Sequence, residues 1–332
     1  MTIPFPLYPN TSYIKYDKHN NAPYLAYKKK PTAFAEQVDK LISRNMIIDN
    51  KTEAIKILSD ISYYHLSPYW KPFCKSDSDD FEEGTIFSKI VEIYNFDKEL
   101  REFLLKYIAP IEVAYKTCFV NYFCMATTDP FAYLIKDNFN HAGKWEQSVN
   151  KIIDEFEKSK EDFANHHKKN YPNLMPPLWL VSEFLTLGEL NFWVANLKDS
   201  VKYLNKSVRD LISDHFGLTF SLFTSFIMSL TNIRNFCAHQ CRVWDRNIIN
   251  QPKQPSNTKS FLYKNMIINF SSGQKKGIYN TLVILAYCLK KMKYTDSFAL
   301  ELISIIKKYN IDPLKMGFPQ SWDKLSLWKI DR

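Results

Sequence analysis

An arginine, an asparagine and a histidine lie close together in residues 234–239, which read Arg-Asn-Phe-Cys-Ala-His. A histidine imidazole takes up or releases a proton near neutral pH, so it can act as a general base or acid. The guanidinium of an arginine is a permanent cation whose planar fork matches phosphate oxygens and the charge that gathers on them in a transition state. RNA supplies its own nucleophile, the 2′-hydroxyl. Arg234, Asn235 and His239 therefore provide the parts of a ribonuclease that needs no metal and no protein nucleophile.

The spacing of these three residues leaves two interpretations open. Asn235 and His239 are four residues apart and share one face of a helix. Arg234 and His239 are five apart, about 140° around an ideal helix, so they point in nearly opposite directions. A working site then requires a helix that breaks between them, or residues from two protomers. From spacing alone, a structural arginine and a surface histidine is the simpler interpretation, and Arg209 and His215 form a second loose pair of this kind.

The helix that must position this motif is expected over residues 218–240. Its apolar residues follow a 3,4,3,4 spacing, at Phe223, Phe226, Leu230, Ile233 and Cys237. Such a stripe is a seam for another helix, either within the chain or across a dimer. Plain core packing is the favoured explanation of the stripe itself.

The remaining pattern predicts an all-α, multi-helix bundle. Only seven glycines occur in 332 residues, although sheet-rich and Rossmann folds use glycine heavily, and no strict alternation persists. Thr32 is a plausible N-cap for a helix over 33–45, with Ala35, Val38, Leu41 and Ile42 on one face. Further helices are expected over 53–63, 86–126, 140–169, 178–196, 200–215, 278–293 and 297–309. Pro110 is expected to end or kink the helix over 86–126, and a second limb begins at Ile111.

The positive charge of the chain is concentrated at one end. Residues 251–332 hold 14 Lys and Arg against 5 Asp and Glu, which accounts for the whole net charge of +9, while residues 1–250 hold 30 of each sign. A basic segment beside a neutral body suits a polyanion such as nucleic acid, although a merely solvated, lysine-rich surface fits equally well. We expect an extended arm over residues 1–30, a helical domain over 31–250, and a basic helical segment over 251–332 packed on that domain.

Composition also narrows the cellular setting. No apolar run reaches the roughly 18 residues of a membrane span, and the first residues lack the pattern of a secretory signal. Six cysteines without paired spacing are typical of buried thiols in a reducing compartment. We therefore expect a soluble, cytoplasmic protein. Cys237 and Cys241 bracket His239, but a structural zinc site would need two more ligands that no spacing supplies, so we predict neither a metal nor a cofactor.

Several stretches of the chain resemble the Abi-like, or abortive-infection, protein family, and their order and spacing make the resemblance specific. Together they span nearly the whole chain from about residue 31. They are residues Ile61–Trp70, Phe96–Arg101 with Ile111–Thr117, Pro177–Glu183 with Leu187–Leu190, Ile233–His239 with Val243–Asn247, and Met316–Trp322.

The resemblance implies a function as well as a fold. In this family the stretch around Arg234 and His239 resembles the Arg-x4-His signature of HEPN domains, which are helical ribonucleases that commonly form dimers and cut RNA at a composite site. It therefore implies a HEPN-like bundle with N- and C-terminal helical extensions, and a metal-independent endoribonuclease of a phage-defence or toxin–antitoxin system. RNA is the implied substrate, a homodimer the implied assembly, and a cognate antitoxin or regulatory non-coding RNA the implied restraint.

Other residues enter as supporting candidates. Glu112 and Glu183 lie in family-like stretches on largely apolar helices, where an unpaired carboxylate is costly, so either could orient His239 or pair with Arg234. For Glu112, a structural ion pair with Lys116 or Arg101 is the alternative. The candidates for contact with RNA are Lys275, Lys276, Lys290, Lys291, Lys293, Arg242 and Arg246.

Two rival functions and one rival reaction fit the same sequence. A non-catalytic RNA-binding module would bind RNA without His239 and would not cleave it. A protein-interaction component of a defence complex would have negligible affinity for RNA even at low salt. The HEPN site could also transfer nucleotides to a protein.

Overall fold

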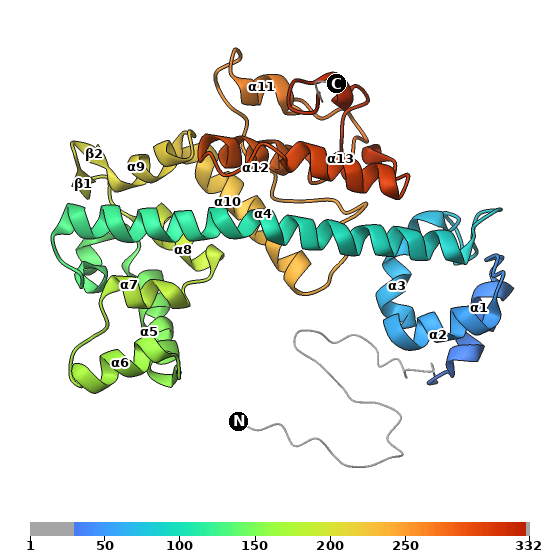
Figure 1. Cartoon of the computed structure of the whole chain (residues 1–332), viewed down its shortest axis with the longest axis horizontal. Helices are drawn as coiled ribbons and strands as arrows, with labels where there is room; N and C mark the ends of the chain where they lie inside the picture. Colours follow the sequence, from blue (N-terminus) through green and yellow to red (C-terminus); the bar gives the residue numbers. More distant parts are fainter. Residues whose placement is uncertain (1–29, 330–332) are drawn as a thin grey trace, which may run out of the picture. The chain divides into compact units, whose positions relative to one another are not determined.

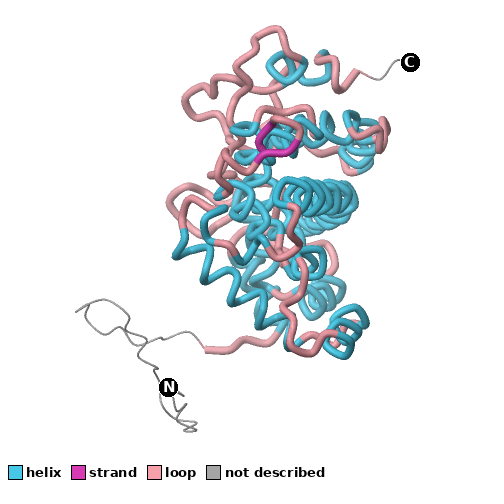
Figure 2. The backbone as a smooth tube through the Cα atoms, turned by 90° about the vertical axis from the view of Figure 1, so that its left-hand side faces the viewer, coloured by secondary structure: helices cyan, strands magenta, loops and turns pink. Residues whose placement is uncertain are grey.

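The computed structural model describes residues 30–329. These fall into two compact units, and the boundary along the chain lies between Ile90 and Val91. The described residues are predominantly helical, and the one sheet among them is a small hairpin of two strands (Figures 1 and 2). The prediction of an all-α protein is confirmed. The arm predicted over residues 1–30 lies outside the described residues, apart from Lys30.

The first unit contains three short helices, α1 (Phe34–Ser43), α2 (Lys51–Ile61) and α3 (Tyr63–Trp70). The N-cap of α1 is Ala33 and not Thr32, because the Glu36 carboxylate accepts a hydrogen bond from the Ala33 backbone N–H at 2.7 Å. On the predicted apolar face Val38 and Leu41 are buried, whereas Ala35 is exposed. The second predicted helix begins two residues earlier than expected, since Asn50 supplies the cap at its N-terminus.

The long helix α4 (Phe87–Thr127) begins in the first unit and belongs to the second from Val91 onwards. The prediction that Pro110 ends or kinks it was wrong, because α4 continues straight through this residue (Figure 1). A proline inside a helix removes one backbone hydrogen bond. Here both sides of Pro110 are held by buried side chains of the same face, Tyr107, Ile108, Ile111 and Tyr115, so packing outweighs the lost bond.

Around α4 the second unit places the following elements, in chain order: α5 (Ala142–Lys158), α6 (Asp162–Asn170), α7 (Leu178–Val181), the 3-10 turn η4 (Ser182–Phe184), α8 (Leu187–Asn196), β1 (Lys202–Tyr203), β2 (Lys206–Ser207), α9 (Val208–His215), α10 (Phe220–Ala238), α11 (Phe261–Asn265), α12 (Tyr279–Lys291) and α13 (Phe298–Lys308). The helices predicted over 218–240, 278–293 and 297–309 are confirmed to within two residues at each end. The short helix α11 was not predicted.

Three predicted helices are interrupted, each for a local reason. The helix expected over 140–169 divides after Lys158. There the Lys168 ammonium donates a hydrogen bond to the carbonyl of Ser159, the C-cap residue, at 2.8 Å. The helix expected over 178–196 divides because Thr186 and Glu189 form a capping box that starts α8. The helix expected over 200–215 gives way to the β1–β2 hairpin, whose turn residues Leu204 and Asn205 both have positive φ.

The apolar stripe of α10 lies in the core of the second unit. Its five members are at most 1% exposed, and α10 packs on α8, α9 and α12. The ring of Phe223 contacts those of Tyr115 on α4 and Phe216, with 4.9 Å between centroids in each pair. The stripe is therefore a seam within the chain. Its five residues are covered by other parts of the same chain and are not open to a dimer partner.

The C-terminal residues pack closely against the loop that precedes α12. A Cβ on Gly277 would lie 2.0 Å from the Met316 carbonyl oxygen, so only glycine fits there. Gly317 has a φ of +85°, and the next residue, Phe318, joins an aromatic cluster with Tyr279 and Trp328. These contacts fix the backbone beside Lys275 and Lys276. Among the described helices none alone is long and apolar enough to cross a membrane, and α9 and α10, bent by 66°, meet that test only as a pair.

Candidate functional site at the C-terminus of α10

The last turn of α10 presents all three residues of the predicted site. Arg234 is half-buried, and Asn235 and His239 are exposed. The helix ends at Ala238, and His239 is its C-cap, with its backbone N–H donating to the Asn235 carbonyl at 3.0 Å. Within residues 30–329, no hydrogen bond or ion pair joins the side chains of the three. The helix runs unbroken from Arg234 to Ala238, so it does not break near Cys237 in the way that would bring Arg234 and His239 together within one chain.

The chain leaves α10 through a tight, hydrogen-bonded turn. Gln240 has a φ of +56°, and its N–H donates to the Cys237 carbonyl at 3.2 Å. The N–H of Cys241 donates to the Phe236 carbonyl at 2.8 Å. These two bonds make a Schellman motif, which normally uses glycine at the position of Gln240. The motif fixes the direction in which the backbone leaves His239.

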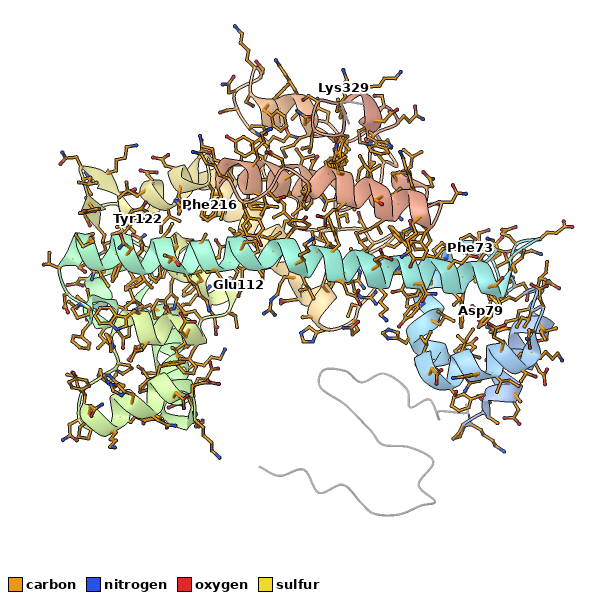
Figure 3. The ribbon with its side chains drawn as sticks, viewed as in Figure 1. Phe73, Asp79, Glu112, Tyr122, Phe216 and Lys329 are labelled. Carbon is orange, nitrogen blue, oxygen red and sulfur yellow. The ribbon has the colours of Figure 1, made fainter. Side chains whose placement is uncertain are left out.

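Glu112 on α4 faces Arg234. Its Oε2 lies 3.8 Å from Arg234 Nε, and the Glu112 side chain is only 19% exposed (Figure 3). The alternative partners of Glu112 are engaged elsewhere: Lys116 donates to the backbone carbonyl of Glu183 at 3.4 Å, and Arg101 pairs with Asp97. Among the described residues, the ion pair of Glu112 is therefore the one with Arg234.

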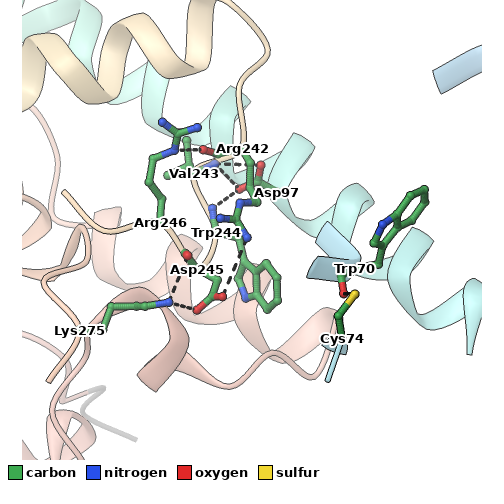
Figure 4. Close-up of polar contacts among 9 residues, drawn as sticks. All are labelled: Trp70, Cys74, Asp97, Arg242, Val243, Trp244, Asp245, Arg246 and Lys275. Carbon is green, nitrogen blue, oxygen red and sulfur yellow. Dashed lines mark hydrogen bonds and ion pairs between the residues drawn. The ribbon is translucent and has the colours of Figure 1, made fainter. Parts of the chain in front are cut away.

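A buried carboxylate holds the segment that follows His239. Asp97, fully buried on α4, accepts hydrogen bonds from the backbone N–H groups of Val243 at 3.1 Å and Trp244 at 2.5 Å (Figure 4). It also pairs with Arg101 at 2.5 Å, one turn along the same helix. A buried charge that is paired and satisfied by several donors is costly to disrupt. Asp97 and Arg101 thus anchor the turn at the end of α10 from the other side of the core.

A comparison with protein-family models now adds to this geometry. The model described as Abi-like protein matches residues 56–245, more than half of the chain. The chain belongs to the Abi-like family. The match contains Asp97, Glu112 and the whole of α10, and it ends at Asp245, inside the anchored segment. No curated protein and no solved structure matches the chain.

The family connects this Abi-like protein with abortive infection, a defence of bacteria against phage. The basic segment after residue 250 lies outside the matched region, as does the first described helix, α1. The family model therefore includes the residues that build and anchor the end of α10.

The predicted RNA-contacting residues of the Abi-like protein separate into two groups. The first surrounds Asp245, close to the end of α10. Lys275 donates to the Asp245 carboxylate and, at 3.1 Å, to its backbone carbonyl, while Arg242 lies 3.9 Å from the same carboxylate. The Arg246 guanidinium lies over the ring of Phe236, 4.1 Å from the ring centroid. The single carboxylate of Asp245 thus balances one of the three positive charges of this group.

The second group lies at the opposite end of α12. Lys290, Lys291 and Lys293 line one cavity, and Lys290 Nζ is 3.5 Å from a carboxylate oxygen of Asp296. The 13 residues of α12 separate this group from the first by about 20 Å. Lys276 is assigned to neither group, and its ammonium lies 5.8 Å from the ring centroid of Phe270. The seven candidates therefore do not form one patch.

The two cysteines that bracket His239 have different surroundings. Cys237 is completely buried, and burial raises the pKa of its thiol to about 12, so it remains protonated at neutral pH. The thiolate, not the thiol, is the form that binds metals and reacts. Cys241 is partly exposed. Among residues 30–329 no three His, Cys, Asp or Glu side chains are grouped as a metal-ligand set.

Sequence reasoning missed two features of the site. Asp97 entered only as part of a family-like stretch, and Arg101 only there and as an alternative partner of Glu112. Their i,i+4 spacing gave no sign that Asp97 accepts hydrogen bonds from backbone N–H groups 146 and 147 residues away. Trp179 likewise entered only as part of the family-like stretch Pro177–Glu183. It is half-exposed and lines a cavity together with Glu112 and Glu183, so these two carboxylates share one surface.

Proposed function

We propose that this Abi-like protein is a metal-independent endoribonuclease of an abortive-infection system, with Arg234, Asn235 and His239 as its catalytic residues. The observation that carries the proposal is the end of α10. An arginine oriented by a partly buried carboxylate and an exposed histidine lie there on one anchored turn. Family membership supports the biological setting.

The proposed reaction is transesterification of the RNA backbone. His239 accepts the proton of a 2′-hydroxyl as its oxygen attacks the adjacent phosphorus, and the bond from phosphorus to the 5′-oxygen breaks. That oxygen takes up a proton as it leaves, so the products are a 2′,3′-cyclic phosphate and a 5′-hydroxyl. Arg234 stabilises the charge on the phosphorane oxygens, and Asn235 holds the phosphate or His239.

We propose further that the complete site is composite, with two copies of the chain contributing. Within one chain no contact joins the side chains of Arg234 and His239 among the described residues, and both reach the surface. A second copy facing the end of α10 would add a second histidine and a second arginine to one phosphate. The buried stripe of α10 takes no part in that dimer.

The test compares wild type with His239→Ala on labelled single-stranded and structured RNAs in EDTA. His215→Ala is a matched control, because His215 is also exposed at the end of a helix, α9, and its loose partner Arg209 is paired with Asp199. We expect cleavage by wild type and His215→Ala and a loss of at least about 100-fold in His239→Ala. Binding of RNA by all three without cleavage would support the binding-module alternative, and absence of binding at low salt the protein-interaction alternative.

A further inference from the structure

A cavity of about 510 Å³ lies between α4 and the segment formed by α7 and η4, next to the ion pair of Glu112 and Arg234. Figure 1 shows α7 running beside α4. Residues 109–121 of α4 supply one wall, with Glu112, Val113 and Lys116 facing the cavity, and Trp179 and Glu183 lie on the other. The volume is within the range of about 300–1,000 Å³ that is typical of small-ligand sites.

The charges around this cavity oppose an anionic occupant. Glu112 and Glu183 supply two carboxylates, and Lys116 is the one cation among the lining residues. The Lys116 ammonium is directed to the backbone carbonyl of Glu183 at 3.4 Å. A phosphate would meet a net negative wall, whereas a neutral ligand with N–H donors would find carboxylate oxygens that can only accept.

The apolar part of the lining offers a flat surface. The Trp179 side chain is 50% exposed although large aromatic residues are usually well buried, and Val113 on the facing wall is 63% exposed. An exposed indole beside hydrogen-bonding groups is the arrangement with which proteins bind unpaired nucleobases, by stacking on the ring and reading the base edge.

We propose that this cavity binds one nucleobase of a single-stranded RNA, and that guanine is the preferred base. Trp179 stacks on the base, and the two oxygens of the Glu183 carboxylate accept hydrogen bonds from the adjacent N1–H and N2–H donors of guanine. Uracil offers a single N–H between two carbonyl oxygens, which the carboxylate repels. Glu112 forms part of the same wall and holds Arg234, so the bound base belongs to a nucleotide next to the phosphate that Arg234 contacts.

This inference rests on the proposed function for the position of the cut, but binding is measured without cleavage. The probes are fluorescent hexamers of 2′-fluoro RNA, which lack the attacking hydroxyl: one of six uridines, and one with a guanosine at the third position. In fluorescence anisotropy at low salt, wild type is expected to bind the guanosine hexamer about tenfold more tightly.

Three variants and two controls test whether Trp179 and Glu183 cause this preference. Trp179→Ala and Glu183→Gln are each expected to abolish the preference, and Trp179→Phe to retain part of it. Tyr171→Ala removes an exposed aromatic ring from the neighbouring cavity, which Trp179 also lines, and Glu157→Gln neutralises an exposed carboxylate outside both. Both controls are expected to keep the preference. Equal affinity of wild type for the two hexamers, or a preference that survives Trp179→Ala and Glu183→Gln, would overturn the inference.

The two proposals fail in different ways. A protein that prefers the guanosine hexamer but cleaves no RNA in a His239-dependent manner contradicts the proposed function alone. A protein that cleaves through His239 but binds both hexamers equally contradicts the nucleobase site alone.

Discussion

At the scale of single residues, the central interaction is the pair of Glu112 and Arg234. The distance of 3.8 Å and the partial exposure of both side chains make it a weak contributor to stability. We expect the pair to act by orienting Arg234. A guanidinium that already contacts one carboxylate loses less conformational freedom when it binds a phosphate. Catalysis is sensitive to displacements of about 1 Å, which can cost about 100-fold in rate.

Glu112→Gln therefore tests whether the Glu112 carboxylate positions Arg234, because it removes the charge and leaves the size of the side chain almost unchanged. We expect kcat/KM for RNA cleavage to fall about tenfold or more, while the free energy of unfolding changes by no more than about 0.5 kcal/mol. Urea unfolding and cleavage kinetics on the same preparations check both numbers. Glu157→Gln is the matched control on an exposed site of α5. Wild-type kinetics in Glu112→Gln would show that this carboxylate does not position Arg234.

Local spacing places Arg234, Asn235 and His239 near one end of one helix, and the resemblance to the family, not the spacing, made them the candidate site. The contacts that orient and anchor them join residues separated by 122 positions (Glu112 to Arg234) and by 146 or more (Asp97 to Val243 and Trp244). Glu112 could be weighed as a candidate because its charge required a partner. Asp97 could not, since its partners are backbone N–H groups that carry no sequence signal.

At the scale of elements, the anchoring of α10 to α4 depends on the buried carboxylate of Asp97. Asp97→Asn removes the charge that faces Arg101 and one acceptor of the backbone N–H groups. We expect the free energy of unfolding to fall by about 3–5 kcal/mol, as is usual when a buried ion pair is broken. Glu99→Gln, which removes a more exposed carboxylate two residues further along α4, is expected to cost about 1 kcal/mol or less. Equal effects of the two substitutions in urea unfolding would contradict this difference.

The contact between α4 and α13 is expected to weaken in acid. The pKa of Glu99 is lowered, chiefly by the hydrogen bond from Lys308 on α13 at 2.6 Å. The pKa of Glu301 on α13 is lowered as well, since burial acts to raise it but hydrogen bonds led by that from Lys106 on α4 outweigh burial. Carboxylates whose folded pKa is lowered stabilise the protein above the unfolded pKa of about 4.3, and this stabilisation is lost as the pH falls through the folded value.

The double variant Glu99→Gln/Glu301→Gln tests whether these two carboxylates cause the loss of stability in acid. Between pH 6 and pH 3.5 its free energy of unfolding should fall less steeply than that of wild type, because two groups that take up protons on unfolding are gone. Glu157→Gln should follow wild type. An unchanged pH dependence in the double variant would rule out these two pairs as the source of acid lability.

The predicted elements show where sequence patterns suffice. The apolar periodicity of α4, α10, α12 and α13 predicted where each helix begins and ends to within two residues. The interruptions at Lys158, at Thr186 and at the hairpin turn of Leu204 and Asn205 were missed, because apolar periodicity continues across them and only the caps and turns reveal the break. Pro110 shows the reverse case, in which a local helix-breaking signal gave way to tertiary burial.

At the scale of the whole molecule, the proposal of a composite site makes a prediction about mixtures. Arg234→Ala and His239→Ala should each be inactive alone. If two copies of the chain share a site, a dimer that contains one of each variant regains a site with both residues, so mixing the two should restore cleavage. Cleavage assays on mixed samples, with pull-down of differently tagged copies to show that mixed dimers form, provide the measurement. Mixed dimers without cleavage would place the whole site within one chain.

The distribution of charge also belongs to this scale. The sequence located the excess of lysine correctly in residues 251–332, but it could not show that Asp245 balances Lys275 and Arg242 or that α12 separates the other lysines from them. Both facts depend on contacts between distant segments.

The most direct test of the account is the chemistry of the RNA ends. Labelled RNA is incubated with wild type and with His239→Ala in EDTA, and the products are examined by mass spectrometry. We expect 2′,3′-cyclic phosphate and 5′-hydroxyl ends from wild type and no products from His239→Ala. Products with 3′-hydroxyl and 5′-phosphate ends, or equal cleavage by the two proteins, would contradict attack by the 2′-oxygen at this site.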